Sequence, residues 1–143
     1  MPDLDERFAL ALHNTARCWR QAVDRRLKYL GVSQSSWMTI TIAAKAPNPL
    51  SQSELAERLG VEGATMVAMV DRLAKAGLVV RAPSSTDRRV NHVLLTEAGS
   101  ALYAKVRSEA TLVRKKLLAD VEPAALLKAT KLLESLQEAI DTF

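Results

Sequence analysis

The stretch LSQSELAERLGVEGATMVAMVDRLAKAGLV, residues 50–79, decides the fold of this chain. Ser51 or Ser53 can cap a short helix that runs to Leu59, and Gly60 can adopt the positive φ of a tight turn. A second helix is expected over about residues 62–76. Its apolar side chains recur with helical spacing, at Met66, Met69, Val70 and Leu73. Two short helices joined by a glycine turn predict a helix-turn-helix motif.

The residues that follow this motif have the composition of a β-hairpin. The β-prone runs LVVR and NHVLL lie on either side of APSSTDR, whose Pro, Ser, Thr and Asp favour a turn. We therefore expect a two-stranded hairpin within residues 78–95. A hairpin directly after a helix-turn-helix is a wing, so residues 33–96 are predicted to form a winged helix-turn-helix module.

Helices are expected on both sides of this module. Asp3 and Glu6 have the spacing of a capping box, and the helix they begin should end at Gly31. Its apolar stripe comprises Leu4, Phe8, Leu12, Ala16, Trp19, Val23, Leu27 and Leu30. Ser33 can cap the next segment, QSSWMTITIAAKA, in which the alternating TITI also fits a strand; the flanking apolar residues favour a helix.

Two closing helices complete the prediction. Thr96 begins one of them, and Pro123 lies in the first turn of the other, where proline is well tolerated. The chain is therefore predicted to be mainly α with a small β-hairpin.

The composition bounds the class of protein. The chain has 143 residues, 48% of them hydrophobic, which is enough for one globular domain. Its single cysteine, Cys18, excludes an internal disulfide and fits a reducing compartment. The acidic start MPDLDER does not resemble a signal peptide, and no apolar run approaches the ~20 residues that span a bilayer. We expect a cytoplasmic protein without a membrane partner.

The charge is consistent with a polyanionic partner but does not prove one. The net charge is +4 and the pI is about 9.5. The surplus lies at the N-terminus, where residues 1–50 carry seven Lys or Arg against four Asp or Glu. A solvated helix face would give the same count, so the motifs must decide the function.

Four motifs together resemble the MarR family of bacterial transcriptional regulators, SlyA-like members in particular. They are LAERLG (55–60), DRLAKAGL (71–78), Asp87-x-Arg89 and LTEAG (95–99). The resemblance covers nearly the whole chain. It implies a homodimer held by helices within residues 1–32 and 97–143, which flank the DNA-binding module. It further implies a pseudo-palindromic operator and either repression or activation of transcription, often relieved by a small phenolic or lipophilic effector. Of the two outcomes, repression is the one expected.

In such a module the second helix enters the major groove of double-stranded DNA. The outward face is then formed by Gly63, Ala64, Thr65, Val67, Ala68 and Arg72. SlyA-like proteins usually have an arginine near Ala68, and this chain has none there. We therefore predict modest discrimination between bases, through Thr65, methyl contacts to thymine and DNA shape. Ser51 and Ser53, at the start of the first motif helix, either bind a phosphate or only cap that helix.

The wing contains an acid in front of two arginines. In an extended wing, residues two apart point to the same side, so Asp87 should lie beside Arg89 while Arg88 faces away. A carboxylate there can hold the guanidinium by two hydrogen bonds and orient it for the minor groove. Arg89 is therefore expected in the minor groove, and Arg88 on a phosphate or in solvent.

Several residues of the first two helices have alternative interpretations. His13, Arg17, Trp19 and Trp37 lie where the family's ligand crevice is expected and are the candidate effector-binding residues, although core packing also explains the aromatic ones. Cys18 could sense oxidants, as one branch of the family uses an N-terminal cysteine. Its position differs from that of the reactive cysteine, so a buried or inert thiol is the favoured interpretation.

Other classes of function are disfavoured by the sequence. The chain has two histidines and one cysteine, and it lacks a nucleophile elbow and a phosphate-binding loop. We expect no catalytic residues, no metal and no cofactor. The remaining alternative is a helical protein-interaction module that binds DNA weakly or not at all, against which the wing arginines argue.

Overall fold

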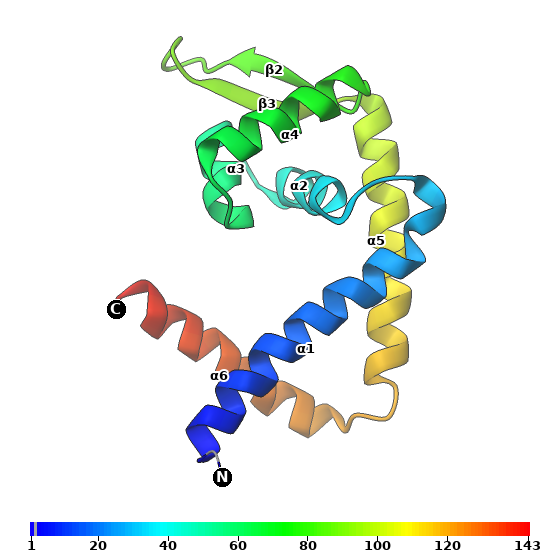
Figure 1. The fold of residues 1–143 in the computed structure, drawn as a ribbon, viewed down its shortest axis with the longest axis vertical. Helices are drawn as coiled ribbons and strands as arrows, with labels where there is room; N and C mark the ends of the chain where they lie inside the picture. The colour runs from blue at the N-terminus through cyan, green and yellow to red at the C-terminus, as the bar shows by residue number, and fades with distance from the viewer. Residues whose placement is uncertain (2) are drawn as a thin grey trace. The chain divides into compact units, whose positions relative to one another are not determined.

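The computed structural model describes Met1 and residues 3–143, and it is mostly helical with one small antiparallel sheet (Figure 1). The elements in chain order are α1 (Leu4–Arg26), the 3-10 turn η1 (Lys28–Leu30), α2 (Gln34–Lys45), β1 (Leu50–Ser51), α3 (Gln52–Leu59), α4 (Gly63–Lys75), β2 (Val79–Pro83), β3 (Asn91–Leu95), α5 (Glu97–Leu118) and α6 (Pro123–Asp141). The predicted fold class, a winged helix-turn-helix between flanking helices, is confirmed.

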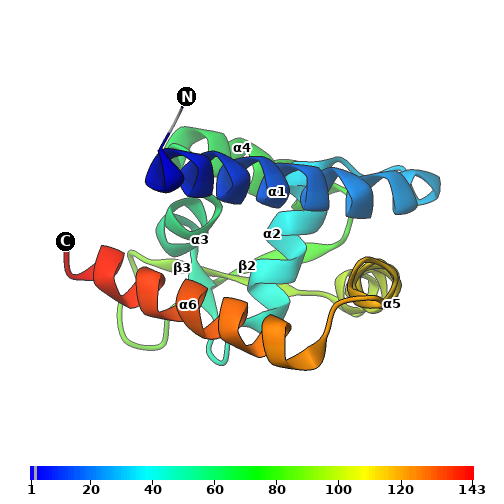
Figure 2. The same cartoon turned by 90° about the horizontal axis from the view of Figure 1, so that it is seen from below.

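The core of the winged module is built by short elements that could not fold alone. Helices α2, α3 and α4 gather beside the three strands (Figure 1; Figure 2). The predicted inward residues of α4 are all buried. They join one apolar cluster with Ile40, Leu50, Leu55, Ala56, Val79 and Val93. Burial of this shared cluster is the main stabilisation available to helices of 8 to 13 residues.

The sheet has three strands in the order β1-β3-β2, so the expectation of a two-stranded hairpin was incomplete. The strand β1 is only two residues long, and it pairs antiparallel to β3 with Leu50 opposite Val93 and Ser51 opposite His92. Such a short strand has no pattern of its own in the sequence. Its existence depends on β3, which lies forty residues further along the chain.

Local capping fixes the start and end of the motif helices. Ser51 caps α3: its Oγ accepts from the backbone N–H of Glu54 at 3.1 Å, and the Glu54 carboxylate accepts from the N–H of Ser51 at 3.1 Å. Gly60 ends α3 with φ +80°. The α4 helix begins after Glu62 and ends before Ala76, as predicted. The first helix was expected to end at Gly31, but α1 ends at Arg26. The 3-10 turn η1 follows it, and Gly31, with φ +69°, ends that turn.

The LTEAG motif packs the start of α5 on the turn between α4 and β2. Thr96 donates its backbone N–H to the Leu78 carbonyl at 3.1 Å and its hydroxyl to the Gly77 carbonyl at 2.6 Å. Gly99, in the first turn of α5, lies so close that a β-carbon there would overlap the Leu78 carbonyl oxygen. Only glycine fits this approach.

The chain divides into two compact units, Met1–Thr111 and Leu112–Phe143. The second unit contains the end of α5 and α6. The α6 helix has no buried residue in the described chain. Its exposed large apolar side chains include Leu127, Leu132, Leu133 and Ile140. Among the helices that the structure describes, none is long and apolar enough to cross a membrane.

Candidate nucleic-acid interface

One face of α4 is open along its whole length. Gly63, Ala64, Thr65, Val67, Ala68 and Arg72 are all exposed, while the opposite face is buried in the core. The exposed face is mainly small and apolar, and the Arg72 guanidinium rests against the sulfur of Met69 at 3.6 Å. Its shape and lack of bulk would let the helix backbone approach another surface closely.

The two serines at the start of α3 differ in exposure. Ser51 is buried and its hydroxyl is used in the capping box, whereas Ser53 is exposed in the first turn. Hydrogen bonds with Ser51 lower the pKa of Glu54. The bond to the Ser51 backbone has the largest effect, and the bond to its side chain has the next largest. Of the two serines, Ser53 is the one whose side chain is open to a ligand at this end of the helix.

The wing tip orders Asp87 and Arg89 as a pair. The Asp87 carboxylate accepts from Arg89 Nε at 3.2 Å and from Arg89 Nη2 at 3.3 Å, one bond to each oxygen. It also accepts from the backbone N–H of Arg89 at 3.0 Å. These hydrogen bonds from Arg89 lower the pKa of Asp87, and those from the side chain have a larger effect than the one from the backbone. The Asp87 side chain is 39% exposed, whereas that of Arg89 is 90% exposed.

The geometry behind this pair differs from the expected extended wing. The Val90 N–H donates to the Asp87 carbonyl at 3.1 Å, so residues 87–90 form a turn. The pair therefore arises because an aspartate at the first position of a turn accepts from the backbone two residues on. The expectation of strand alternation was wrong, although the pairing it predicted is present.

Ser84 anchors the loop that carries this turn. It is buried, and its Oγ accepts from the backbone N–H of Thr86 at 3.2 Å and of Asp87 at 3.4 Å. Its own N–H donates to the Val90 carbonyl at 2.8 Å and closes the loop. The sequence suggested only a turn here and gave no sign of this internal anchor.

Arg81 was not among the predicted site residues, yet it joins three elements. From β2, its Nε donates to Gln52 Oε1 of α3 at 2.7 Å. Its Nη2 donates to Asp71 Oδ1 at 2.6 Å and to the Val67 carbonyl at 3.3 Å, both in α4. Its partners are 10 to 29 positions away in sequence, so no local pattern could reveal the cluster.

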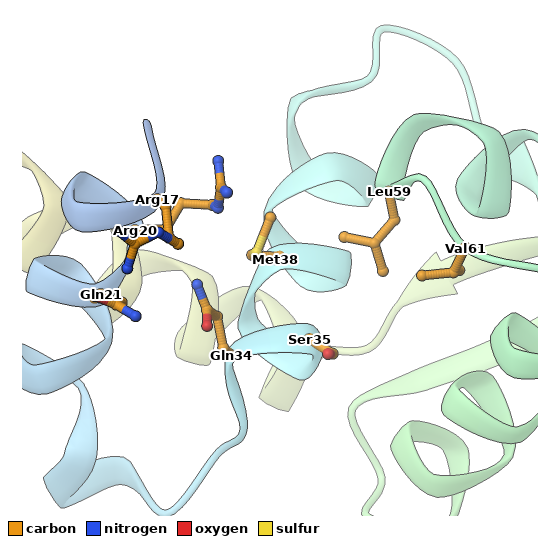
Figure 3. Close-up of a pocket in the computed structure, with 8 residues that line it drawn as sticks. All are labelled: Arg17, Arg20, Gln21, Gln34, Ser35, Met38, Leu59 and Val61. Carbon is orange, nitrogen blue, oxygen red and sulfur yellow. The ribbon is translucent and has the colours of Figure 1, made fainter. Parts of the chain in front are cut away.

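A cavity of about 270 Å³ lies between α1, α2 and the turn of the helix-turn-helix (Figure 3). Its walls consist of Arg17, Arg20, Gln21, Gln34, Ser35, Met38, Leu59 and Val61. No acid is among these residues. Arg17 and Arg20 approach from α1, whereas Leu59 and Val61 flank Gly60, the turn before α4. The cavity is therefore positively charged on one side and apolar on the other.

Of the predicted effector-binding residues, Arg17 lines this cavity, and His13, Trp19 and Trp37 do not. Trp37 is buried at 7% exposure, and its indole N–H donates to Asp24 Oδ1 at 2.9 Å, which joins α2 to α1. The favoured interpretation of Cys18 was a buried or an inert thiol. Burial is wrong, because Cys18 is exposed, and an inert thiol stays a prediction.

An exposed helix beside a wing that presents arginine defines a winged helix-turn-helix protein, the class that inserts this helix into DNA. Residues 27–90 match the model of the MarR family. The chain belongs to the MarR family of transcriptional regulators and has its winged helix fold.

Solved structures agree with this assignment over nearly the full length. The transcriptional regulator PA3341 is 32% identical, with a TM-score of 0.89 over 95% of this chain and 99% of that one. AbsC from Streptomyces coelicolor, a MarR family regulator, is 20% identical, with a TM-score of 0.81 over 100% and 99%. CouR from Rhodococcus jostii RHA1, solved with p-coumaroyl-CoA, is 21% identical, with a TM-score of 0.80 over 95% of each chain. The SlyA-like branch stays a prediction.

Proposed function

We propose that the protein is a homodimeric repressor that binds a pseudo-palindromic operator, with α4 in the major groove and Arg89 in the minor groove. The observation that carries this proposal is the wing pair: Arg89 is 90% exposed, yet its guanidinium is held at two points by Asp87. Such an arginine loses little rotamer freedom when it enters a narrow groove. Arg88 then binds a phosphate or lies in solvent.

The contacts of α4 follow from its exposed face. Thr65 and Arg72 are its polar groups, and Ala64, Val67 and Ala68 offer only methyl contacts, while Gly63 allows close approach. Base readout is correspondingly modest, and a sharp guanine preference opposite Ala68 in selected sites would contradict it. The exposed Ser53 and the first N–H groups of α3 are proposed to bind a phosphate, with Ser51 acting through the cap.

Exposed apolar residues on the flanking helices support the homodimer. In α1 these include Leu4, Phe8, Leu10 and Leu12, and α6 has the exposed leucines described above. Surfaces of this kind on long helices are costly in water and are covered in stable proteins. We assign residues 1–32 and 97–143 to the dimer and residues 33–96 to DNA binding. Sedimentation of the purified protein tests the dimer directly.

Selection of binding sites from random duplex DNA tests DNA binding and gives the operator. On the selected site, Arg89→Ala should weaken binding more than Arg88→Ala, which is the matched control of equal charge. Asp87→Ala should also weaken binding, although it removes a negative charge. If Asp87→Ala tightens binding, the carboxylate does not orient Arg89.

Salt dependence separates this proposal from a protein-interaction module. A dimer with six or more phosphate contacts should lose affinity on the order of 10³-fold between 50 and 200 mM salt. A module without DNA contacts would bind duplex DNA barely at either salt concentration. That result would contradict the proposed function.

We further propose that an acidic effector binds in the cavity beside Arg17 and Arg20. Its volume of about 270 Å³ is near the lower end of ligand pockets, which favours a small ligand with an anionic head and an apolar body. CouR, a structural relative, was solved with p-coumaroyl-CoA, which supports ligand binding in this fold. A phenolic acid fits both this charge and the expectation from the family.

Calorimetry with 3-phenylpropionate and its neutral amide tests the class of effector. The acid should bind and the amide should not. Arg17→Gln should weaken binding about tenfold, the value of a charge-assisted hydrogen bond. Arg25→Gln, on the same helix and outside the cavity wall, should leave binding unchanged. Equal binding of acid and amide would contradict an anionic effector.

The exposure of Cys18 favours one alternative mode of regulation. A thiol that is open to solvent can react with peroxide, and this would change DNA binding if oxidation altered α1. We expect no such effect, because the position of Cys18 differs from that of the reactive cysteine in the redox-sensing branch of the family. Operator affinity that falls with peroxide in the wild type, but not in Cys18→Ser, would establish redox control.

A further inference from the structure

We infer that Arg81 is a positioning residue that fixes the wing relative to the recognition helix, with Asp71 as its essential partner. The inference rests on the proposed DNA-binding function. Arg81 lies in β2, the strand that leads to the wing tip, and its hydrogen bonds reach Val67 and Asp71 of α4. Its side chain therefore joins the element that reads the major groove to the one proposed for the minor groove.

The guanidinium is held on more than one side. Nε donates to Gln52 at 2.7 Å, and Nη2 donates to Asp71 at 2.6 Å and to the Val67 carbonyl at 3.3 Å. A guanidinium is planar, with its donors in a fixed fork. Acceptors from two helices therefore set both the position and the direction of the strand from which it projects.

Each partner of Arg81 is adjacent to a proposed DNA contact. Gln52 directly precedes Ser53 at the start of α3. Val67 and Asp71 lie beside Ala68 and Arg72 on α4. A shift of Arg81 would therefore change the spacing between the phosphate contact, the major-groove face and the wing together.

Arg81 is poorly placed to bind DNA itself. Its side chain is 28% exposed, compared with 90% for Arg89, and its charge is paired with Asp71. Pairing with an acid does not separate the two arginines, because Arg89 is paired with Asp87, but the low exposure of Arg81 does. The two possible roles differ in salt dependence, because a lost phosphate contact lowers the salt slope by about one.

Substitution of Asp71 gives the sharper test. Asp71 either holds Arg81 or only repels DNA, and these two roles predict opposite changes in DNA affinity when its charge is removed. It is an acid, 62% exposed, on the helix proposed to enter DNA. If it only repelled DNA, its neutralisation would tighten binding. If it holds Arg81, the same change loosens the wing and weakens binding.

The experiment measures operator affinity for Asp71→Asn, which preserves size and an acceptor oxygen. We expect weaker binding, by about threefold to tenfold, as a partly exposed charge-assisted bond becomes a neutral one. Glu62→Gln is the matched control: it removes an exposed acid at the start of the same helix whose side chain makes no capping bond. That variant should bind as well as the wild type or slightly tighter. Tighter binding by Asp71→Asn would overturn the inference.

A second measurement separates positioning from general loss of structure. Arg89→Ala should cost less in the Arg81→Gln background than in the wild type, because an unheld wing no longer places Arg89. With Arg89→Ala already in place, adding Arg81→Gln should leave the salt slope unchanged. Additive losses, or a slope lowered by about one by this second substitution, would overturn the inference. Failure of the wild type to bind DNA would count against the proposed function, whereas normal Arg89-dependent binding with a tighter Asp71→Asn would count against the inference alone.

Discussion

Two glycines in the first turns of helices should respond in opposite ways to the same substitution. At Gly99, in α5, a methyl group would overlap the Leu78 carbonyl oxygen. At Gly63, in α4, the same methyl group would meet no atom within 4 Å. Neither glycine has a positive φ, so backbone conformation does not decide the outcome. The difference in packing alone therefore decides whether the substitution by alanine stabilises or destabilises the protein.

The cost at Gly99 can be worked from its surroundings. A methyl group forced into a filled site costs about 1–3 kcal/mol. Moving α5 away instead would strain the two bonds that Thr96 makes to Gly77 and Leu78, each worth about 1 kcal/mol. Replacing glycine in a helix returns about 0.5–1 kcal/mol. Gly99→Ala should therefore lose about 1–2 kcal/mol, whereas Gly63→Ala should gain about 0.4–1 kcal/mol.

Urea and thermal unfolding followed by circular dichroism measure both variants. The protein concentration must be equal in all samples, because dimerisation shifts the apparent stability. For a chain of this size the loss at Gly99 corresponds to a fall in Tm of about 2–8 °C. Gly99→Ala as stable as the wild type, or Gly63→Ala less stable than it, would refute the packing argument.

Three further outcomes follow from single contacts. Because folding lowers the pKa of Glu54, its ionised form contributes stability above its ordinary pKa of about 4.3, and this is lost as the pH falls through the lowered value. Unfolding curves should thus show the wild type more stable than Glu54→Gln at pH 7, with a difference that shrinks as the pH falls through the lowered pKa of Glu54. In Ser84→Ala, hydrogen exchange should quicken at the amides of residues 86–87, and unchanged protection would disprove the anchor. Trp37→Phe should cost about 1–2 kcal/mol in urea unfolding, and little in an Asp24→Ala background that already lacks the bond.

The sequence allowed good prediction of elements whose signals are local. Helical spacing of apolar residues located α4 and its buried face, and the cap residue Ser33 located the start of α2. For α3 the sequence offered Ser51 or Ser53 as the cap, and the structure uses Ser51. The same local chemistry correctly joined Asp87 to Arg89. The reason given for this pair, an extended wing, was wrong, because residues 87–90 form a turn. The pair was still predicted because a turn, like a strand, can bring residues two positions apart together.

Features that depend on distant pairing escaped prediction. The strand β1 exists only because β3 supplies its partners, and Arg81 finds its acceptors on two other elements. The outward arginines of α1 looked alike in sequence, yet Arg17 and Arg20 line the cavity and Arg26 bonds to Glu109 of α5 at 2.8 Å. Such differences follow from tertiary packing, which no spacing along one helix encodes.

The shared position of Ser51 limits how the protein can be re-engineered. The residue ends β1, opposite His92, and the next residue begins α3, so strand and helix have no linker between them. One residue inserted before Ser51 would shift the pairing by one and turn Leu50 out of the core. Chimeras that exchange parts with other regulators should therefore transfer β1 and α3 as one segment, together with β3, to which β1 pairs.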